Sequence, residues 1–336
     1  FAKLANADDW EEVEIFAKSN EEFLRQYIGL ENGIPSHDTM QRVMGSIAPE
    51  YMQGVYNKWH ELVNSNEGET LKKIICIDGK TMRGNQSNGQ KANHIVSAWC
   101  DMDGFCLGQK KVEEKSNEIT AIPQLLDAIQ IKGSVITVDA MGTQTEIVEK
   151  IKQKHADYTL AVKENQKNLY REISEYFEDV ELLKEIKCNN RYRITKEKSH
   201  SQIETREYYQ CSKIGWMQEK SRWKGIKSIG MICKTTEQSG KQVTERRYYI
   251  SSLPLFARTV REHWSVEVMH WHLDVTFKED ANTTLDKTAA QNLNIINKWC
   301  LSILKLFDVG KKLSLRKKRY CISMNARKYL EQILSL

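Results

Sequence analysis

The stretch KKIICIDGK, residues 72–80, decides the fold of this chain. Its short apolar run predicts a buried strand that ends at Asp78 and Gly79. Two further apolar runs, HIVSAWC at 94–100 and FCLGQKKV at 105–112, flank the turn signal DMDG and predict a hairpin. Three successive strands therefore open this part of the chain.

Beyond the hairpin, helical and strand patterns alternate. A helix with Ser116 or Asn117 as its N-cap is followed by a buried strand that ends in Asp139, then by a second helix and a further strand. The order βββαβαβ is the plan of the ribonuclease H-like fold, in which right-handed crossovers place the first and fourth strands side by side. Asp78 and Asp139 are then expected at neighbouring strand ends, where open α/β sheets bind ligands.

The rest of the chain predicts three further regions around this core. Apolar residues recur at helical spacing before the polar break NSNEGET at 64–70, β-like runs fill about 191–252, and helical spacing returns after Pro254. The fold class is therefore α/β, with a ribonuclease H-like core, a β-rich insertion and an N-terminal helical domain. The predicted boundaries are 1–65 for the helical domain, 70–185 for the first part of the core, 186–253 for the insertion and 254–336 for the completion of the core.

Composition narrows the class of protein. The 336 residues are 40% hydrophobic and 28% charged, which is typical of a globular chain, and no apolar run approaches the ~18 residues of a membrane span. The eight cysteines form no C-x-x-C pair, which argues against zinc and against a disulfide framework. Position 1 is Phe and no secretory signal is visible, so we expect a cytoplasmic protein that lacks its natural N-terminus.

The charge is distributed unevenly. Residues 1–65 hold eleven acidic and five basic side chains, a net charge of −6. Because the whole chain has a net charge of +5, the remaining residues carry a net charge of +11. One basic segment interleaves Trp216 and Trp223 with cations, and bases stack on aromatic rings while cations hold phosphates. A solvated basic face, and tryptophans that pack the core of the insertion, are the alternatives. The densest basic segments are 213–227 and 305–328.

An acid stands inside the apolar stretch HWSVEVMHWHLD, residues 263–274. In a helix Glu267, His270, Trp271 and Asp274 share one face, because they follow one another at i, i+3, i+4 and i+7. If that helix packs beside the strand ends, Glu267 completes a group of three carboxylates. The surrounding tryptophan, valine and methionine side chains are expected to exclude water.

Three clustered carboxylates repel one another unless a cation neutralises them. Mg²⁺ is the natural partner, with Mn²⁺ as a substitute, because it takes carboxylate, water and phosphate oxygens. Two such ions about 3.5–4 Å apart activate a water and stabilise the leaving oxygen of a phosphodiester. The acids therefore predict nuclease or strand-transfer chemistry.

Structural readings of the same residues stay open at this point. Asp139 could cap the helix that follows it, and Asp78 could lie in a tight turn with Gly79. Glu267 could form a salt bridge with Arg258 or Arg261. The histidines of the stretch, His263, His270 and His272, lack the H-E-x-x-H spacing of a zinc site, so a role in supporting the ligands of the site or in packing is preferred for them.

Five ordered stretches carry a resemblance to a known family: GIPSHDTMQRV, IDGKTMRGN, VDAMGTQTEIVEKI, LAVKENQ and REHWSVEVMHWHLDVTFKEDA. In order and spacing the chain resembles the ISAs-type insertion-sequence transposases, relatives of the H-repeat-associated proteins. The resemblance implies a DDE transposase whose metal-binding catalytic residues fall on Asp78, Asp139 and Glu267. It also implies an N-terminal associated domain and a β-rich insertion between the second aspartate and the glutamate.

The sequence departs from the wider group around its glutamate. That group carries Tyr-x2-Arg-x3-Glu-x6-Lys, whereas the corresponding positions here are Val260, His263, Glu267 and Asp274. We expect Arg261, Trp264 and Lys278, from the same helix, to contact DNA in their place. The residues predicted to contact DNA are Lys80, Arg83, Trp216, Arg222, Trp223, Lys224, Arg261, His263, Trp264 and Lys278.

Together these features predict a Mg²⁺-dependent DNA transposase. It would nick transposon ends by attack of water, join the freed 3′-hydroxyl to target DNA, and act as a homodimer on DNA. The alternatives are a catalytically silent DNA-binding remnant, a ribonuclease H-like structure-specific nuclease, and a metabolic α/β enzyme whose acids are caps.

Overall fold

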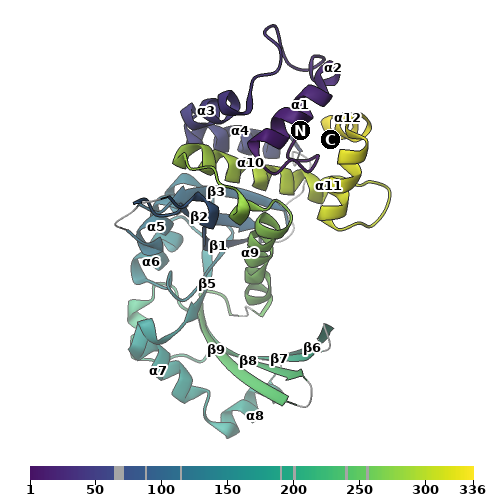
Figure 1. Ribbon diagram of the computed structural model, residues 1–336. Coiled ribbons are helices and arrows are strands. Elements are labelled where there is room, and N and C mark those ends of the chain that lie inside the picture. The colour runs from purple at the N-terminus through teal and green to yellow at the C-terminus, as the bar shows by residue number, and fades with distance from the viewer. Residues whose placement is uncertain are drawn as a thin grey trace. The chain divides into compact units, whose positions relative to one another are not determined.

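The computed structural model describes residues 1–63, 72–87, 89–113, 116–189, 191–199, 202–238, 241–254 and 257–336 (Figure 1). The predicted linker at 64–70 lies outside these residues. The chain forms two compact units. Unit 1 comprises Phe1–Thr70, Gly79–Lys115 and Val266–Leu336, and unit 2 comprises Leu71–Asp78 and Ser116–Ser265.

Unit 2 is built on a mixed sheet. Its strands run side by side in the order β1 (Ile74–Thr81), β4 (Val135–Val138), β5 (Asp157–Val162), β9 (Lys241–Ser251), β8 (Ser228–Gln238), β7 (Gln202–Cys211) and β6 (Tyr192–Ser199). The strands β1, β4 and β5 are parallel, and each later pair is antiparallel. The expectation that the first and fourth strands are neighbours is confirmed.

Two amphipathic helices make the parallel crossovers. Helix α5 (Glu118–Ala128) buries Ala121, Ile122, Leu125 and Leu126, and α6 (Thr145–Gln153) buries Ile147, Val148 and Ile151. The N-cap of α5 is Asn117, as the sequence allowed, although its side chain makes no capping hydrogen bond. Each helix covers a sheet whose Ile and Val residues are almost completely buried, so hydrophobic burial holds this part together.

The four β-like runs predicted between residues 191 and 252 are strands, and they extend the same sheet rather than forming a separate one. Before them come η2 (Glu164–Gln166), α7 (Lys167–Tyr176) and α8 (Val180–Cys188), and η3 (Glu219–Arg222) lies between β7 and β8. Helices α7 and α8 lie along one side of the curved strands β6 to β9 (Figure 1). The strands β6 to β9 form an antiparallel ribbon. The end of this ribbon that lies beside β5, where β7 and β9 end and β8 begins, is buried, and its opposite end is polar and more exposed.

Unit 1 is mainly helical. Its elements are α1 (Trp10–Ser19), α2 (Glu21–Leu24), α3 (His37–Ser46), α4 (Pro49–Val63), η1 (Arg83–Asn85), β2 (His94–Cys100), β3 (Phe105–Lys111), η4 (Glu279–Ala281), α10 (Lys287–Leu306), α11 (Leu315–Met324) and α12 (Ala326–Leu334). The predicted hairpin is confirmed, since β2 and β3 are antiparallel and Cys100 faces Phe105 across the DMDG turn. Helix α9 (Ala257–Val275) is continuous and passes from unit 2 into unit 1.

Helix α10 is the centre of unit 1, and it contacts α3 and α4 from the N-terminal part of the chain and α11 from the C-terminal part (Figure 1). The side-chain amide of Asn292 donates to the carbonyls of Met44 (2.8 Å) and Ile47 (2.9 Å), which end α3. The hydroxyls of Tyr56 in α4 and Ser302 in α10 lie 2.6 Å apart. The N-terminal helices therefore share one core with the C-terminal ones.

Candidate active site

Two aspartates of unit 2 come directly after the paired residues of two neighbouring parallel strands. In the register of β1 and β4, Ile77 is paired with Val138, and Asp78 and Asp139 are the next residues along their strands. Strand β1 continues through Gly79 to Thr81, so the tight turn considered for Asp78 is wrong. The N-cap of α6 is Gln144, so the helix cap considered for Asp139 is wrong as well. The register thus leaves both carboxyl groups at the same edge of the sheet.

The loop after β4 fixes Asp139. The Oδ1 atom of Asp139 accepts the amide of Gly142 at 3.1 Å, and the hydroxyl of Thr143 donates to the carbonyl of Ala161 at 2.6 Å. A side chain at position 142 would begin 2.1 Å from Val138 Cγ1, so only glycine fits this turn. Burial raises the pKa of Asp139, and the Gly142 amide offsets part of that effect. The carboxyl group is held in place in surroundings that disfavour its charge.

The first half of α9 lies across the same two strands. The thiol of Cys76 in β1 donates to the carbonyl of Glu262 at 3.2 Å, and the Thr137 hydroxyl in β4 lies 2.9 Å from Nδ1 of His263. Cys76 and Thr137 each precede one of the two aspartates by two residues. Because burial, together with the charge of Arg247, lowers the pKa of His263 to about 4, its ring is neutral at physiological pH. His263 therefore has the packing role preferred from the sequence, and it is not an exposed DNA contact.

Glu267 follows in the same helix, within unit 1, and its side chain is exposed. The expectation that bulky neighbours exclude water from it is wrong. Val266, Met269 and Leu273 are buried on one side of α9, whereas Val268 and Trp271 are 52% and 54% exposed. The apolar residues of this helix thus divide between two sides, which the spacing alone did not separate.

The cations proposed as salt-bridge partners of Glu267 pair with other acids. Arg258 Nε lies 2.5 Å from Glu262 Oε1, one turn along α9, and Arg261 Nη2 lies 2.6 Å from Glu197 Oε1 in β6. Each of these arginines therefore already has a carboxylate within unit 2. Among the described residues, no group of three His, Cys, Asp or Glu side chains is arranged as a metal site. The pair Asp78 and Asp139 nevertheless supplies the hard oxygen donors that Mg²⁺ prefers, with water and phosphate oxygens as its other ligands.

Comparison with known proteins identifies the family. Residues 69–303 match the family described as "Transposase DDE domain", and residues 1–60 match the one described as "DDE_Tnp_1-associated". This chain belongs to the DDE transposase family. The resemblance drawn from the five sequence stretches is thereby confirmed.

Relatives match this transposase over nearly its whole length. The "H repeat-associated putative transposase YhhI" of Escherichia coli (strain K12) is 37% identical over 351 residues, which cover 99% of this chain and 89% of that protein. The "Putative transposase YncI" of Escherichia coli O157:H7 is 37% identical, and the match covers 99% of this chain and 86% of that protein. The "Putative protein YbfL" of strain K12 is also 37% identical and covers 100% and 90%. None of the helices described in the transposase is long and apolar enough to cross a bilayer.

The cations predicted to contact DNA divide by exposure. The side chains of Arg83, Lys278, Arg222 and Arg261 are 83%, 60%, 54% and 49% exposed, and Lys224 is exposed as well. Lys278 lies beyond the end of α9, with a left-handed φ of +50°, and contacts Asp8 Oδ2 at 2.9 Å. The expectation that it belongs to the same helix is therefore wrong. Lys80 is only 10% exposed and faces three carboxylates.

The tryptophans divide in the same way. Trp223 is 1% exposed, so it belongs to the core of unit 2 and the interpretation of it as a DNA-stacking residue is wrong. Trp216 is 43% exposed and stacks on Tyr176 with ring centroids 4.5 Å apart. It lines a hollow of about 420 Å³ together with three acids, Glu172, Glu175 and Asp179. Those carboxylates would repel phosphates, so the hollow is a poor place for DNA.

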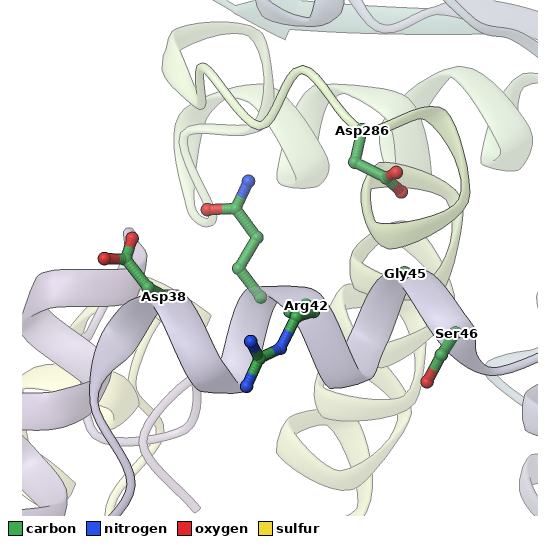
Figure 2. A pocket seen from close by; sticks show the side chains of 6 residues that line it. Asp38, Arg42, Gly45, Ser46 and Asp286 are labelled. Atoms are coloured by element: carbon green, nitrogen blue, oxygen red, sulfur yellow. The ribbon is translucent and has the colours of Figure 1, made fainter.

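Two features escaped the analysis of the sequence. The guanidinium of Arg247 in β9 lies 4.7 Å from the ring centre of Trp264, which is 37% exposed, so a cation from the ribbon covers a predicted DNA contact. Two of the acids around Lys80, Glu279 and Asp280, follow α9 in the run FKEDA, and only their place in the fold reveals them. A separate hollow of about 450 Å³ in unit 1 holds none of the predicted residues (Figure 2). It is lined by Asp38, Gln41, Arg42, Gly45, Ser46 and Asp286.

Proposed function

We propose that this transposase cleaves DNA at the ends of an insertion sequence in a metal-dependent reaction and joins the freed ends to target DNA. The observation that carries the proposal is the register of β1 and β4, which puts Asp78 and Asp139 next to each other, directly after the paired residues and towards the carboxyl ends of the two strands. Open α/β sheets bind their ligands at that edge. The membership in the DDE transposase family supports the same function.

We further assign the core to the ribonuclease H-like fold. The antiparallel hairpin β2–β3, the parallel pairs β1–β4 and β4–β5, and the crossover helices α5 and α6 support this assignment. In unit 1, the amide of Met82, just past β1, donates to the carbonyl of Asn93 at 2.9 Å, just before β2. The hairpin therefore begins beside the end of the first strand, as the fold requires.

Asp78, Asp139 and Glu267 are the proposed ligands of Mg²⁺ or Mn²⁺, two ions being the expected number. When bound, the cations would lower the pKa of the attacking water and neutralise charge that develops on the phosphate. The raised pKa of Asp139 fits this role, because a nearby cation favours the charged carboxylate that burial disfavours. The exposure of Glu267 leaves it accessible to a large substrate such as DNA.

The reaction divides into two displacements at phosphorus. In the first, a water oxygen bonds to phosphorus while the 3′-oxygen leaves, which gives a 3′-hydroxyl and a 5′-phosphate. In the second, that 3′-hydroxyl attacks a target phosphodiester and displaces another 3′-oxygen, so one bond forms and one breaks. In both steps the residues of this chain provide the three carboxylates, position the phosphate and place basic side chains along the DNA.

The net charge of +11 outside residues 1–65 supports DNA as the partner. The exposed Arg83, Arg222, Lys224, Arg261 and Lys278 are the proposed phosphate contacts. Each phosphate that a protein neutralises lowers log K by roughly 0.9 per tenfold rise in salt. We propose a homodimer as the state that binds two ends.

The decisive experiment incubates the full chain with an end of the element that encodes it, in Mg²⁺, and maps the products. D78N, D139N and E267Q remove one charge each, and D127N, a surface acid of α5 that pairs with Lys150, is the matched control. We expect wild type and D127N to nick and join, and the three variants to bind DNA without cleaving it. Ca²⁺ should support binding but little chemistry.

The alternative functions would give different products in this experiment. Nicks without joined products would identify a nuclease of the same fold rather than a transposase. Specific binding to the end with no cleavage in Mg²⁺ or Mn²⁺ would identify a silent remnant. Cleavage at wild-type rates by any of the three acid variants would exclude that residue from the site.

A further inference from the structure

Lys80 is enclosed by three carboxylates. Its Nζ atom lies 2.7 Å from Asp274 Oδ1, 3.0 Å from Asp280 Oδ1 and 3.4 Å from Glu279 Oε2. Burial alone would lower the pKa of Lys80, but Glu279 and the two hydrogen-bonded aspartates together raise it, so the side chain stays charged. A buried cation with this many partners fixes the segments that supply them. All four residues belong to unit 1.

The acids around Lys80 are themselves held. Glu279 is 2% exposed, and its Oε1 accepts the side-chain amides of Asn294 at 2.8 Å and Asn297 at 3.3 Å, both from α10. Asp280 Oδ1 also accepts the amide of Arg83 at 3.2 Å. The next residue, Gly84, approaches η4 so closely that a Cβ there would lie 2.3 Å from the carbonyl oxygen of Asn282. The network therefore joins the end of β1 to η4 and α10 with little freedom.

The same network is attached to two of the proposed ligands through the chain. Lys80 follows Asp78 by two residues in β1, so the two side chains leave the strand on the same face. Asp274 follows Glu267 by seven residues in α9, which is two turns along the same side of the helix. The contact between Lys80 and Asp274 thus links the strand that supplies one acid to the helix that supplies another.

We propose that Lys80 is a positioning residue of the transposase, which fixes the acid-bearing segments of β1 and α9 for cation binding and does not contact DNA. This inference rests on the proposed function. The sequence predicted Lys80 as a DNA contact, but an ammonium group that is 10% exposed and already paired with carboxylates is poorly placed to reach a phosphate. Residues that orient metal ligands typically change metal affinity by about 10–100-fold when they are replaced.

The test compares K80M with K80R, and R83M is the matched control. Arg83 lies three positions along, is 83% exposed and approaches the same Asp280 at 3.8 Å. Binding of Mn²⁺ to the intact protein is measured by calorimetry and by the paramagnetic resonance of free Mn²⁺, and DNA binding is measured separately in EDTA at several salt concentrations. We expect K80M to weaken Mn²⁺ binding about 10–100-fold and K80R to restore most of the affinity. R83M should leave Mn²⁺ binding unchanged.

DNA affinity separates positioning from phosphate contact. We expect K80M to bind the DNA end as wild type does, whereas R83M should lower the slope of log K against log salt by roughly 0.9. Unchanged Mn²⁺ affinity in K80M, together with a reduced salt slope, would overturn the proposal and make Lys80 a phosphate contact. If K80M does not fold, D274N serves instead, because Lys80 then keeps two carboxylates, and it should weaken Mn²⁺ binding in the same direction.

The ligand variants distinguish this inference from the function on which it rests. If D78N and E267Q keep wild-type Mn²⁺ affinity and cleavage, the proposed function fails. If those two variants lose both properties while K80M and D274N retain Mn²⁺ affinity, only the positioning role of Lys80 fails.

Discussion

The surroundings at the two edges of the parallel strands in unit 2 shift the pKa of an aspartate in opposite directions. At the amino end of β5, the carboxylate of Asp157 forms ion pairs with the ammonium groups of Lys72 (2.6 Å) and Lys152 (2.9 Å). It also accepts a hydrogen bond from the hydroxyl of Ser252 at 2.9 Å. Burial alone would raise the pKa of Asp157, but these partners lower it to about 2. At the carboxyl end of β4, burial raises the pKa of Asp139, with backbone amides as its hydrogen-bond donors.

The difference separates an acid that stabilises the fold from one kept for chemistry. A carboxylate with two lysines contributes to stability, because its charged form is favoured in the folded state. A buried carboxylate with a raised pKa costs stability, and such residues concentrate at functional sites. The two edges should therefore respond in opposite directions to the same Asp→Asn change.

The largest expected effect is on cleavage. D139N should lower the rate of end cleavage by at least about a thousandfold, because several kcal/mol of transition-state stabilisation are lost and each ~1.4 kcal/mol is a factor of ten. D157N should leave the single-turnover rate nearly unchanged. D139N should also raise the melting temperature, since it removes a disfavoured buried charge. Equal loss of cleavage in both variants would break the contrast between the two edges.

The second effect concerns the tryptophans of the insertion, which repeat the contrast between a core residue and an accessible one. W223A should lower the free energy of unfolding by about 3–5 kcal/mol, because it empties a fully buried aromatic site. W216A should cost far less, since that ring is 43% exposed. Urea unfolding of both variants measures the difference. A small effect of W223A would return this residue to the candidate DNA contacts.

The third effect is the stability that Asp157 provides. D157N should lower the free energy of unfolding by about 2 kcal/mol at pH 7, as expected for a partly buried carboxyl whose pKa falls from 3.8 to about 2 on folding. Because the folded pKa is the lower one, this contribution is present above about pH 4 and is lost as the pH falls towards 2. The wild type should therefore lose its advantage over D157N in acid unfolding curves. Parallel curves for the two proteins would contradict the assignment.

The smallest expected effect is that of His263, beside the carboxyl ends. Its pKa of about 4 keeps the ring neutral, so titration of His263 should contribute no inflection to the cleavage rate between about pH 6 and pH 8. H263Q, which keeps an acceptor near Thr137, should show the same pH profile as wild type. An inflection near pH 6.5 that disappears in H263Q would show that the ring takes up a proton during the reaction.

The sequence predicted the parts of the fold that depend on local pattern. The run before Asp78 specified a buried strand, DMDG specified the hairpin, and the alternation of helices and strands specified β1 beside β4. These features follow from residue periodicity and from the handedness of crossovers, which a single chain carries in its order. The family resemblance came from the same ordered stretches.

Burial and pairing could not be predicted in this way. Trp216 and Trp223 stand seven residues apart in one basic segment, and only the packing of the sheet buried one and left the other exposed. The sequence predicted Lys80 as a phosphate contact. In the structure η4, about 200 residues further along the chain, places Glu279 and Asp280 beside its ammonium group. The sequence by itself determined the strands and the identity of the acids that follow their buried runs. The tertiary structure decided which charges are neutralised, because charges are compensated by neighbours in space and those neighbours come from distant segments of the chain.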